Sequence, residues 1–312
     1  MLISFIITYY NESPEMLLAA VDSVMQLSLP EKEREIIVVD DGSAEDILTE
    51  LPGVKDDIIY LRQRNTGLSS ARNMGLLLAS GQYVQFIDAN DYLIPSVYEH
   101  CLDIARFEDP DIVLFEFTDK EGYVMDVTKS KTEGPVDGSL WLKNNNVNAK
   151  AWAYLFKKKI LLNLRFEKSL HKDDEAFTPQ LILRAERLFY TDSKAYFSRK
   201  SEAVEPQMQS EESILKKLND MEKTIFQLHN VASSQSHTNR QALQRRVSQL
   251  TLNYLYNVIK ETHDRTELES RIARLREENL FPVAETNCSL MYRCFGKLVN
   301  NKLGRVMLCK IL

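Results

Sequence analysis

Acidic and amide side chains gather at two places where an apolar segment of the sequence ends. Asp40 and Asp41 follow the apolar residues 35–39, and the tetrapeptide DAND at 88–91 follows the apolar residues 83–87. Carboxylate and amide oxygens are the ligands that Mg²⁺ and Mn²⁺ prefer. One such cluster alone is better explained by a polar loop with helix caps, but two at one edge of a sheet favour a ligand site. We therefore predict a site for a divalent cation and a diphosphate.

These clusters need a scaffold, and the N-terminal part of the chain supplies one in which strand and helix patterns alternate. Apolar runs typical of buried strands lie at 2–7, 35–39, 58–61, 83–87 and 111–115. Helical periodicity follows at 17–25, 68–79 and 95–107. Strands that alternate with helices form a mostly parallel, doubly wound sheet, and ligands bind where its strands end. The predicted fold class is α/β.

Two glycine motifs that bind phosphate are missing from the sequence. No GxGxxG follows the first apolar run, which argues against a dehydrogenase-type dinucleotide fold, and no GxxxxGK[ST] occurs, which excludes the P-loop class. A metal ion would then neutralise the phosphate charge in place of a glycine-rich loop. This absence strengthens the prediction of a metal site.

The remaining sequence changes character twice. Glycine, proline and asparagine interrupt residues 119–150, which we interpret as a hairpin or an irregular insertion. Residues 151–198 mix a short strand near Trp152, helices near 157–162 and 172–185, and two further short strands. Beyond Pro206 the pattern is almost entirely helical. We therefore expect two domains, 1–205 and an all-α extension at 206–312.

The charge is unevenly distributed along the chain. The net charge is −6, from 39 basic and 45 acidic residues, which argues against a nucleic-acid partner. Five of the basic residues and no acid lie in 286–312, where apolar and basic residues interleave. Such a tail is either an amphipathic helix on an anionic membrane surface or a helix that docks on the acidic body. Residues 206–285 form either a helical hairpin or a contact between copies of the chain.

Several features indicate a cytoplasmic protein, at the inner face of the cell membrane if the tail binds lipid. The first residues carry no basic leader, and no apolar run approaches the roughly 20 residues that cross a bilayer. The four cysteines show no metal-binding spacing, which is typical of a reducing compartment.

Four ordered motifs lie within the first 93 residues: IITYYNE at 6–12, VVDDGS at 38–43, NTGLSSARNMG at 65–75 and GQYVQFIDANDYL at 81–93. In this order they resemble the inverting glycosyltransferases of family 2, which have the GT-A fold, and a looser resemblance continues to about residue 204. Together they are specific, although each alone is weak. The resemblance implies a nucleotide-sugar donor, most simply a UDP-sugar, and transfer to a saccharide hydroxyl.

The resemblance also implies roles for individual residues around the donor. Asp41 accepts a hydrogen bond from the base, and Asp88 supports the loop or the sugar. Arg72 either pairs with phosphate or is a surface charge of its helix. The remaining donor-site residues that the motifs imply are Thr8, Tyr10, Glu12, Asn65, Gly67, Asn73 and Lys200.

The metal motif departs from the family pattern at one position. The family shows Asp-x-Asp-Asp, whereas this chain has Asn90 in third place. In this alignment Asp91 binds Mn²⁺ or Mg²⁺, and Asn90 keeps an oxygen ligand without the charge. The change should weaken metal affinity without abolishing the site.

An inverting transfer also needs a carboxylate that takes the proton from the acceptor hydroxyl. The family places it in an acidic pair at the start of a helix, which corresponds here to Asp173 and Asp174. We predict that Asp174 is the base, although acids are common in any first helical turn. Trp152 is predicted either as a wall for the acceptor sugar or as a core residue.

These inferences combine into one expected function and two rivals. We expect a metal-dependent inverting glycosyltransferase of the hexosyltransferase type that extends a surface polysaccharide, such as a capsule, on a saccharide or lipid-linked acceptor. The first rival is a non-catalytic nucleotide-sugar-binding or scaffold protein of the same fold, in which Asn90 marks decay. The second is a nucleotidyltransferase, which would require a loop rich in glycine and arginine after the first strand.

Overall fold

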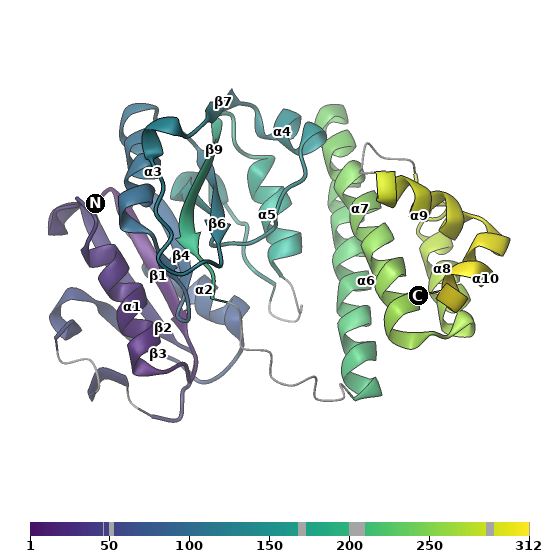
Figure 1. The fold of residues 1–312 in the computed structure, drawn as a ribbon, viewed down its shortest axis with the longest axis horizontal. Coiled ribbons are helices and arrows are strands. Elements are labelled where there is room, and N and C mark those ends of the chain that lie inside the picture. Colours follow the sequence, from purple (N-terminus) through teal and green to yellow (C-terminus); the bar gives the residue numbers. More distant parts are fainter. Residues whose placement is uncertain (46, 50–52, 168–172, 200–209, 285–289, 312) are drawn as a thin grey trace. The chain divides into compact units, whose positions relative to one another are not determined.

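A computed structural model describes residues 1–45, 47–49, 53–167, 173–199, 210–284 and 290–311. The chain forms two compact units. Among the described residues, the first contains 1–141, 146–167 and 173–199, and the second contains 142–145 and 210–311. Figure 1 shows strands and helices in the first unit and helices in the second.

The first unit is built on one mixed sheet. Its strand order is β3-β2-β1-β4-β8-β6-β9-β5, and β7 pairs with β9. The first four strands in this order are parallel, whereas β8 runs antiparallel to β4 and β6. The strands are β1 (Ile3–Tyr9), β2 (Arg34–Asp40), β3 (Ile59–Arg62), β4 (Tyr83–Asp88), β5 (Tyr92–Leu93), β6 (Ile112–Thr118), β7 (Thr132–Val136), β8 (Tyr154–Lys157) and β9 (Leu188–Phe197). The predicted α/β class with a mostly parallel sheet is confirmed.

The helices α1 (Pro14–Met25), α2 (Leu68–Leu78) and α3 (Pro95–Phe107) follow strands of this sheet. All seven residues of β1 are buried, because helices cover both sides of it. Phe5 contacts Tyr98 of α3, and the neighbouring Ile6, which points to the opposite face, meets Gly75 of α2. A Cβ at Gly75 would lie 2.2 Å from a methyl carbon of Ile6. Glycine therefore lets α2 approach the sheet closely.

The strand register brings the predicted site residues to one edge. Thr8 of β1 pairs with Val39 of β2 and with Asp88 of β4, and Tyr9 pairs with Asp40. Since these strands are parallel, their carboxyl ends lie together. The two acidic clusters thus share the edge at which parallel sheets bind ligands.

Residues 119–199 differ in detail from the sequence prediction. The insertion contains β7 and the helix α4 (Gly138–Asn144), and residues 158–161 form a 3₁₀ turn. The helix predicted at 172–185 is α5 (Asp174–Ile182). The two short strands predicted before residue 198 are one ten-residue strand, β9. That prediction was wrong because polar residues at 191–194 interrupt the apolar pattern while β6 and β7 hold the backbone of β9 on both sides.

The second unit confirms the predicted helical region. Its helices are α6 (Glu211–Ser233), α7 (His237–Thr262), α8 (Arg265–Glu277), α9 (Leu290–Asn300) and α10 (Lys302–Ile311). Leucines 218, 228 and 255 are fully buried in its core. Arg271 of α8 pairs with Glu222 of α6 at 2.9 Å, and Tyr254 of α7 donates a hydrogen bond to the same carboxylate. None of the described helices is long and apolar enough to cross a membrane.

Candidate active site

A buried arginine joins three carboxylates at the carboxyl edge of the sheet. Arg72, on the second turn of α2, is only 2% exposed. Its Nη1 lies 2.6 Å from Oδ1 of Asp174 and 3.6 Å from Oδ1 of Asp173. Its Nη2 lies 3.2 Å from Oδ1 of Asp88. The predicted donor residues Arg72 and Asp88 and the predicted base Asp174 therefore form one cluster.

The surroundings of Arg72 fix its charge and its orientation. The guanidinium carbon lies 5.3 Å from the ring centre of Phe166 and 5.9 Å from that of Phe86. Burial lowers the pKa of Arg72, but Asp174, Asp88 and Asp173 raise it more, so the pKa is above its ordinary value. The alternative that Arg72 is a surface charge is wrong, since its side chain is buried. It is a permanent cation inside the site.

Asp174 stands at the first turn of α5 in a setting that suits a base. Asp173 caps the helix: it accepts hydrogen bonds from the backbone N–H of Asp174 at 2.9 Å and from the hydroxyl of Ser69 at 2.5 Å. Burial raises the pKa of Asp174, Arg72 lowers it, and Asp173 and Asp88 raise it again, to about 6. At neutral pH the carboxyl group is therefore ionised, yet more basic than an ordinary aspartate.

Asp41 holds the loop that connects β3 to α2. Its Oδ1 accepts hydrogen bonds from the side chain of Gln63 at 2.7 Å and from the backbone N–H of Thr66 at 3.0 Å, and its Oδ2 accepts from the N–H of Gly67 at 2.7 Å. Gly42 permits this close approach, because a Cβ there would lie 2.6 Å from the backbone nitrogen of Asn65. The loop residues 64–67 are exposed. Asp41 thus holds the loop that contains the predicted donor residues Asn65 and Gly67, and its Oδ2, which accepts one of these bonds, has a second lone pair.

Three predicted donor residues lie at the end of β1 or just after it. Thr8 is buried at the end of the strand, whereas Tyr10 is exposed. Glu12 accepts a hydrogen bond from the backbone N–H of Tyr10 at 2.6 Å. Burial raises the pKa of Glu12, and repulsion from Asp88 and Asp40 adds to the effect despite opposing hydrogen bonds. Glu12 therefore shares the electrostatic environment of the two acidic clusters.

Two other predicted residues, Asn73 and Trp152, are held by contacts with neighbouring residues. Both amide atoms of Asn73 bond the backbone of Phe166, at 2.8 and 2.9 Å, so Asn73 fixes the segment that carries this ring. Trp152 is 4% exposed, and its ring stacks on Tyr196 with centres 4.4 Å apart. Lys150 lies over the Trp152 ring at 5.6 Å, so the acceptor-wall role of Trp152 stays a prediction. Lys200 lies outside the described residues.

The predicted metal ligand Asp91 points into the protein. It is 3% exposed; its Oδ1 accepts a hydrogen bond from the backbone N–H of Arg199 at 2.8 Å, and its Oδ2 accepts one from the hydroxyl of Tyr196 at 3.2 Å. Burial, and then repulsion from Asp88, raises the pKa of Asp91 to about 7. Among the residues that the structure describes, no group of three or more His, Cys, Asp and Glu side chains is arranged so that it could hold a metal ion. As arranged, Asp91 fixes the turn, and Asp88 and Asn90 have the more accessible oxygens of the motif.

Sequence reasoning missed two residues that shape the site. Gln63 bonds Asp41, and Ser69 bonds Asp173. Gln63 comes directly after β3, and Ser69 lies in the first turn of α2, within the motif at 65–75. Their position next to motif residues was the available signal.

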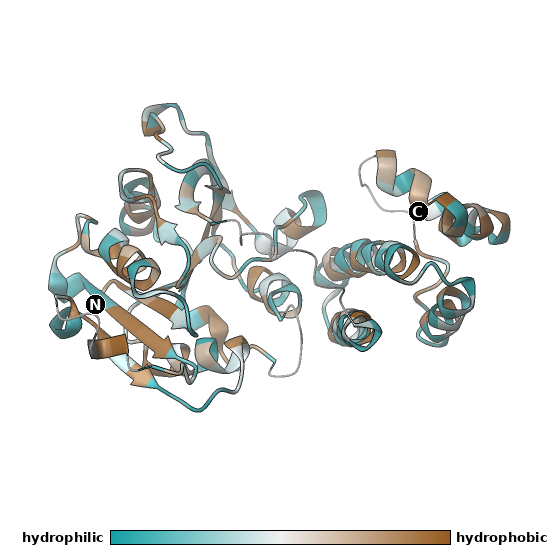
Figure 2. Ribbon diagram, turned by 60° about the horizontal axis from the view of Figure 1, so that its bottom comes forward, coloured by the Kyte–Doolittle hydropathy of each residue, from teal (hydrophilic) through white to brown (hydrophobic). Residues whose placement is uncertain are grey.

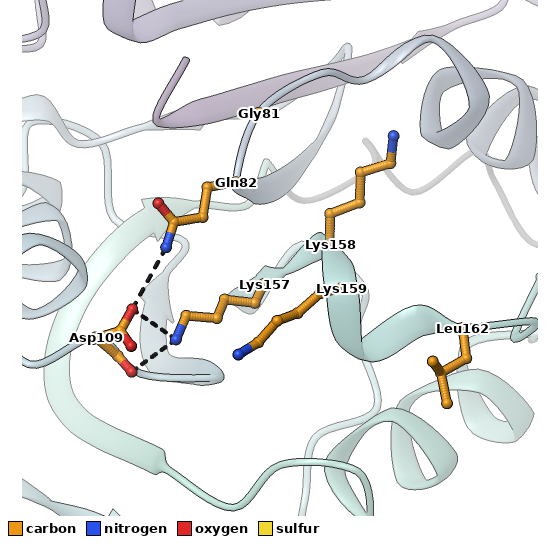
Figure 3. Close-up of a pocket in the computed structure, with 7 residues that line it drawn as sticks. All are labelled: Gly81, Gln82, Asp109, Lys157, Lys158, Lys159 and Leu162. Carbon is orange, nitrogen blue, oxygen red and sulfur yellow. Dashed lines mark hydrogen bonds and ion pairs between the residues drawn. The ribbon is translucent and has the colours of Figure 1, made fainter.

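A separate cavity of about 520 Å³ lies at the opposite, amino edge of the sheet (Figure 3). Three consecutive lysines, 157–159, line it together with Gln82 and Asp109. Nζ of Lys157 lies 2.7 Å from the exposed Asp109 and 3.8 Å from Asp111, so carboxylates offset part of this charge. Gln82 directly precedes β4, and Asp109 lies just before β6.

The family model described as glycosyl transferase family 2 matches residues 4–171. The uncharacterized glycosyltransferase YibD of Escherichia coli K12 is 26% identical over 178 residues, which cover 52% of this chain and 52% of YibD. The uncharacterized glycosyltransferase EpsJ of Bacillus subtilis is 27% identical over 214 residues, which cover 64% of this chain and 61% of EpsJ. The matched region thus spans only about half to three fifths of these relatives.

Solved structures share the fold at low sequence identity. Residues 1–349 of Staphylococcus aureus TarS, solved with UDP-GlcNAc, superpose with a TM-score of 0.70 at 17% identity, covering 99% of this chain and 89% of that one. The mannosyltransferase PcManGT of Pyrobaculum calidifontis, solved with GDP-Man and Mn²⁺, gives a TM-score of 0.56 at 14% identity, covering 98% and 82%. At such identities the likeness concerns the fold, and it confirms the predicted GT-A architecture.

Proposed function

The chain belongs to glycosyl transferase family 2, and we propose that it transfers a sugar with inversion from a nucleotide-sugar to a hydroxyl of a saccharide or lipid-linked saccharide. The observation that carries this proposal is the placement of Asp174, held at 2.6 Å by the buried Arg72 on the edge that also bears Asp41 and Asp88. A single displacement requires a base next to the bound donor, and these residues lie on the same edge of the sheet.

Asp174 would take the proton from the acceptor hydroxyl as that oxygen attacks the anomeric carbon. Its pKa of about 6 keeps it ionised near neutral pH while it retains affinity for a proton. Arg72 would act as a positioning residue. It fixes the carboxylate, and its positive charge opposes the rise in the pKa of Asp174 that burial and repulsion from Asp173 and Asp88 cause. The leaving group would be the nucleoside diphosphate.

The donor nucleotide would lie over the ends of β1 and β2. The second lone pair on Oδ2 of Asp41 suits the imide N–H of a uracil ring, so we propose a UDP-sugar. The exposed residues 64–67 and Tyr10 would border it, with Thr8 and Glu12 at its floor. The UDP and UDP-GlcNAc complexes of TarS support this choice by analogy of fold.

A divalent ion, Mn²⁺ or Mg²⁺, would stabilise the charge on the leaving diphosphate. Asp88 and Asn90 are the residues that would hold it, because Asp91 turns both carboxylate oxygens inward. Protein sites for such ions often supply only one or two oxygens and take the remainder from phosphate and water. The Mn²⁺ bound in the PcManGT complex supports this proposal.

The acceptor end of the site and the biological setting are also proposals. Trp152 and Lys200 would contribute to the walls around the acceptor and the diphosphate, and the product would be a surface polysaccharide or glycolipid.

The inward-facing Asp91 and the neutral Asn90 favour one rival, a protein that binds nucleotide-sugars without transferring them.

Ligand-induced thermal stabilisation tests the donor site directly. We would measure unfolding temperatures with UDP, GDP, dTDP and CDP, each with and without Mn²⁺ or Mg²⁺. A ligand at 100 times its Kd adds about 2.7 kcal/mol of stability. We expect a clear shift with UDP that increases with metal. A shift with another nucleotide would change the donor class, and no shift with any nucleotide would contradict the proposal.

A further inference from the structure

The last two helices of the chain expose large apolar side chains. In Figure 2 the hydropathy colours alternate along these C-terminal helices, which are α9 and α10 in Figure 1. Soluble surfaces carry isolated apolar residues, but a cluster on two consecutive helices marks an interaction surface. The side chains, between 45% and 81% exposed, are those of Leu290, Met291, Leu303, Met307 and Ile311.

The opposite sides of both helices are anchored within the helical unit. On α9, Tyr292 donates a hydrogen bond to Asn253 of α7, and Phe295 packs edge-on against Tyr256. On α10, Arg305 is buried and pairs with Glu269 of α8 at 2.8 Å. The inner faces therefore fix the helices, and the exposed apolar face is held outward by a folded unit.

Cations accompany the apolar residues on the outer sides of the helices. Arg305 is removed from this set by its pairing with Glu269, but Arg293, Lys297, Lys302 and Lys310 are exposed. No acidic residue occurs anywhere in 286–312. On α10 the residues 302, 303, 307 and 310 share the outer side, since the buried residues 304, 305 and 308 define the inner one, and Ile311 is exposed at the end of the helix.

We propose that the outer face of α9 and α10 docks on an anionic lipid bilayer. Such a surface accepts both components of the face, because apolar side chains enter the acyl boundary while lysine and arginine meet lipid phosphates. A second copy of the chain fits less well, because a two-fold contact through this face would bring the cations of both copies into one interface, and 286–312 contains no acidic residue to pair with them. The inference goes beyond the proposed transfer reaction and does not depend on it.

Sedimentation of the full chain with lipid vesicles tests this proposal. We would compare vesicles of phosphatidylcholine alone with vesicles that also contain phosphatidylglycerol, at low and high salt. We expect binding to the anionic vesicles, and weaker binding at high salt. The double variant Lys302→Gln/Lys310→Gln should bind about 25-fold more weakly, since each lysine near an anionic surface contributes about fivefold. Leu303→Asp/Met307→Asp should lose about tenfold or more.

A matched control separates the face from general surface effects. Phe107→Asp/Val124→Asp exchanges two strongly exposed apolar residues of the first unit and should leave vesicle binding unchanged. Circular dichroism and thermal unfolding establish that each variant is folded, and nucleotide stabilisation in free solution should be unchanged throughout. Equal binding by all variants, or no preference for anionic vesicles, would overturn the proposal. So would a change of molar mass by light scattering without a change in vesicle binding, which would identify a second copy as the occupant.

Discussion

Arg72 and Asp174 form an ion pair of 2.6 Å although 102 residues separate them in the sequence. Arg72 stands on α2, which follows the proposed donor loop, and Asp174, the proposed base, is the first residue of α5. Because the guanidinium is buried and also contacts Asp88, the pair links the proposed base to a residue of the proposed donor site. A displacement of either helix would therefore change the distance between base and donor.

The pH dependence of transfer should reflect the raised pKa of Asp174. Below its pKa of about 6 the carboxyl group is protonated and cannot accept the acceptor proton; above it the group is ionised. We expect kcat/KM to fall about tenfold per pH unit below pH 6 and to level off above pH 7. A profile flat between pH 5 and 7.5 would contradict the assignment of the base.

Replacement of Arg72 by methionine should destabilise the fold. It leaves Asp88, Asp173 and Asp174 without their shared cation, and breaking a buried ion pair costs about 3–5 kcal/mol. Urea unfolding at pH 7.5 measures this loss. Arg106→Met is the matched control, because its ion pairs of 3.7 and 3.9 Å lie nearer the surface and should contribute about 0–1 kcal/mol.

The same Arg72 variant has a distinct pH signature. Without the cation, the pKa of Asp174 in the folded state rises further above its unfolded value. Protonation of Asp174 then stabilises the folded variant at low pH, and this stabilisation is lost as the pH rises through the folded pKa. The difference in unfolding free energy between Arg72→Met and the wild type should therefore shrink from pH 7.5 to pH 5. A constant difference would argue against the electrostatic role of Arg72.

Metal affinity should respond to the charge at position 90. Asn90→Asp restores the carboxylate of the family pattern and should lower the apparent Kd for Mn²⁺ by about tenfold, since ligand charge tunes affinity for hard cations. Asn90→Ala removes the oxygen and should raise it. Titration of nucleotide-dependent thermal stabilisation with Mn²⁺ measures both. If neither variant changes the titration, Asn90 is not a ligand.

Nucleotide binding should depend on Asp41. Asp41→Asn would direct an amide N–H₂ toward the donors of the loop, and hydrogen bonds to a charged group contribute about 1.5–3 kcal/mol. We expect the Kd for UDP to rise at least about tenfold by calorimetry. Asp57→Asn, an exposed carboxylate before β3, is the control and should bind UDP as the wild type does.

Most of the sheet could be predicted from the sequence because buried parallel strands are continuous apolar runs. β5 could not be, since two residues are too short to show a period. β9 was divided in the prediction because its middle is polar, and its continuity depends on pairing with β6 and β7. Pairing between distant segments leaves no trace in local periodicity.

The candidate site could likewise be predicted only in part. The motifs located Asp41, Asp88 and Asp174, because each follows a strand or begins a helix. The inward orientation of Asp91 was not predictable, since it depends on Tyr196 and Arg199, which the distant strand β9 and the chain just beyond it supply. The central place of Arg72 likewise emerges only when α2 meets α5.

The most direct test of the account is the rate of nucleoside diphosphate release from the nucleotide-sugar that the thermal screen selects, with water or an added saccharide as acceptor. The account predicts that Asp174→Asn binds the nucleotide normally but releases product about 100- to 10,000-fold more slowly than the wild type. Glu175→Gln, the same loss of charge one residue further along α5, should retain activity. Equal rates for Asp174→Asn and the wild type, or no release by the wild type despite nucleotide binding, would contradict it.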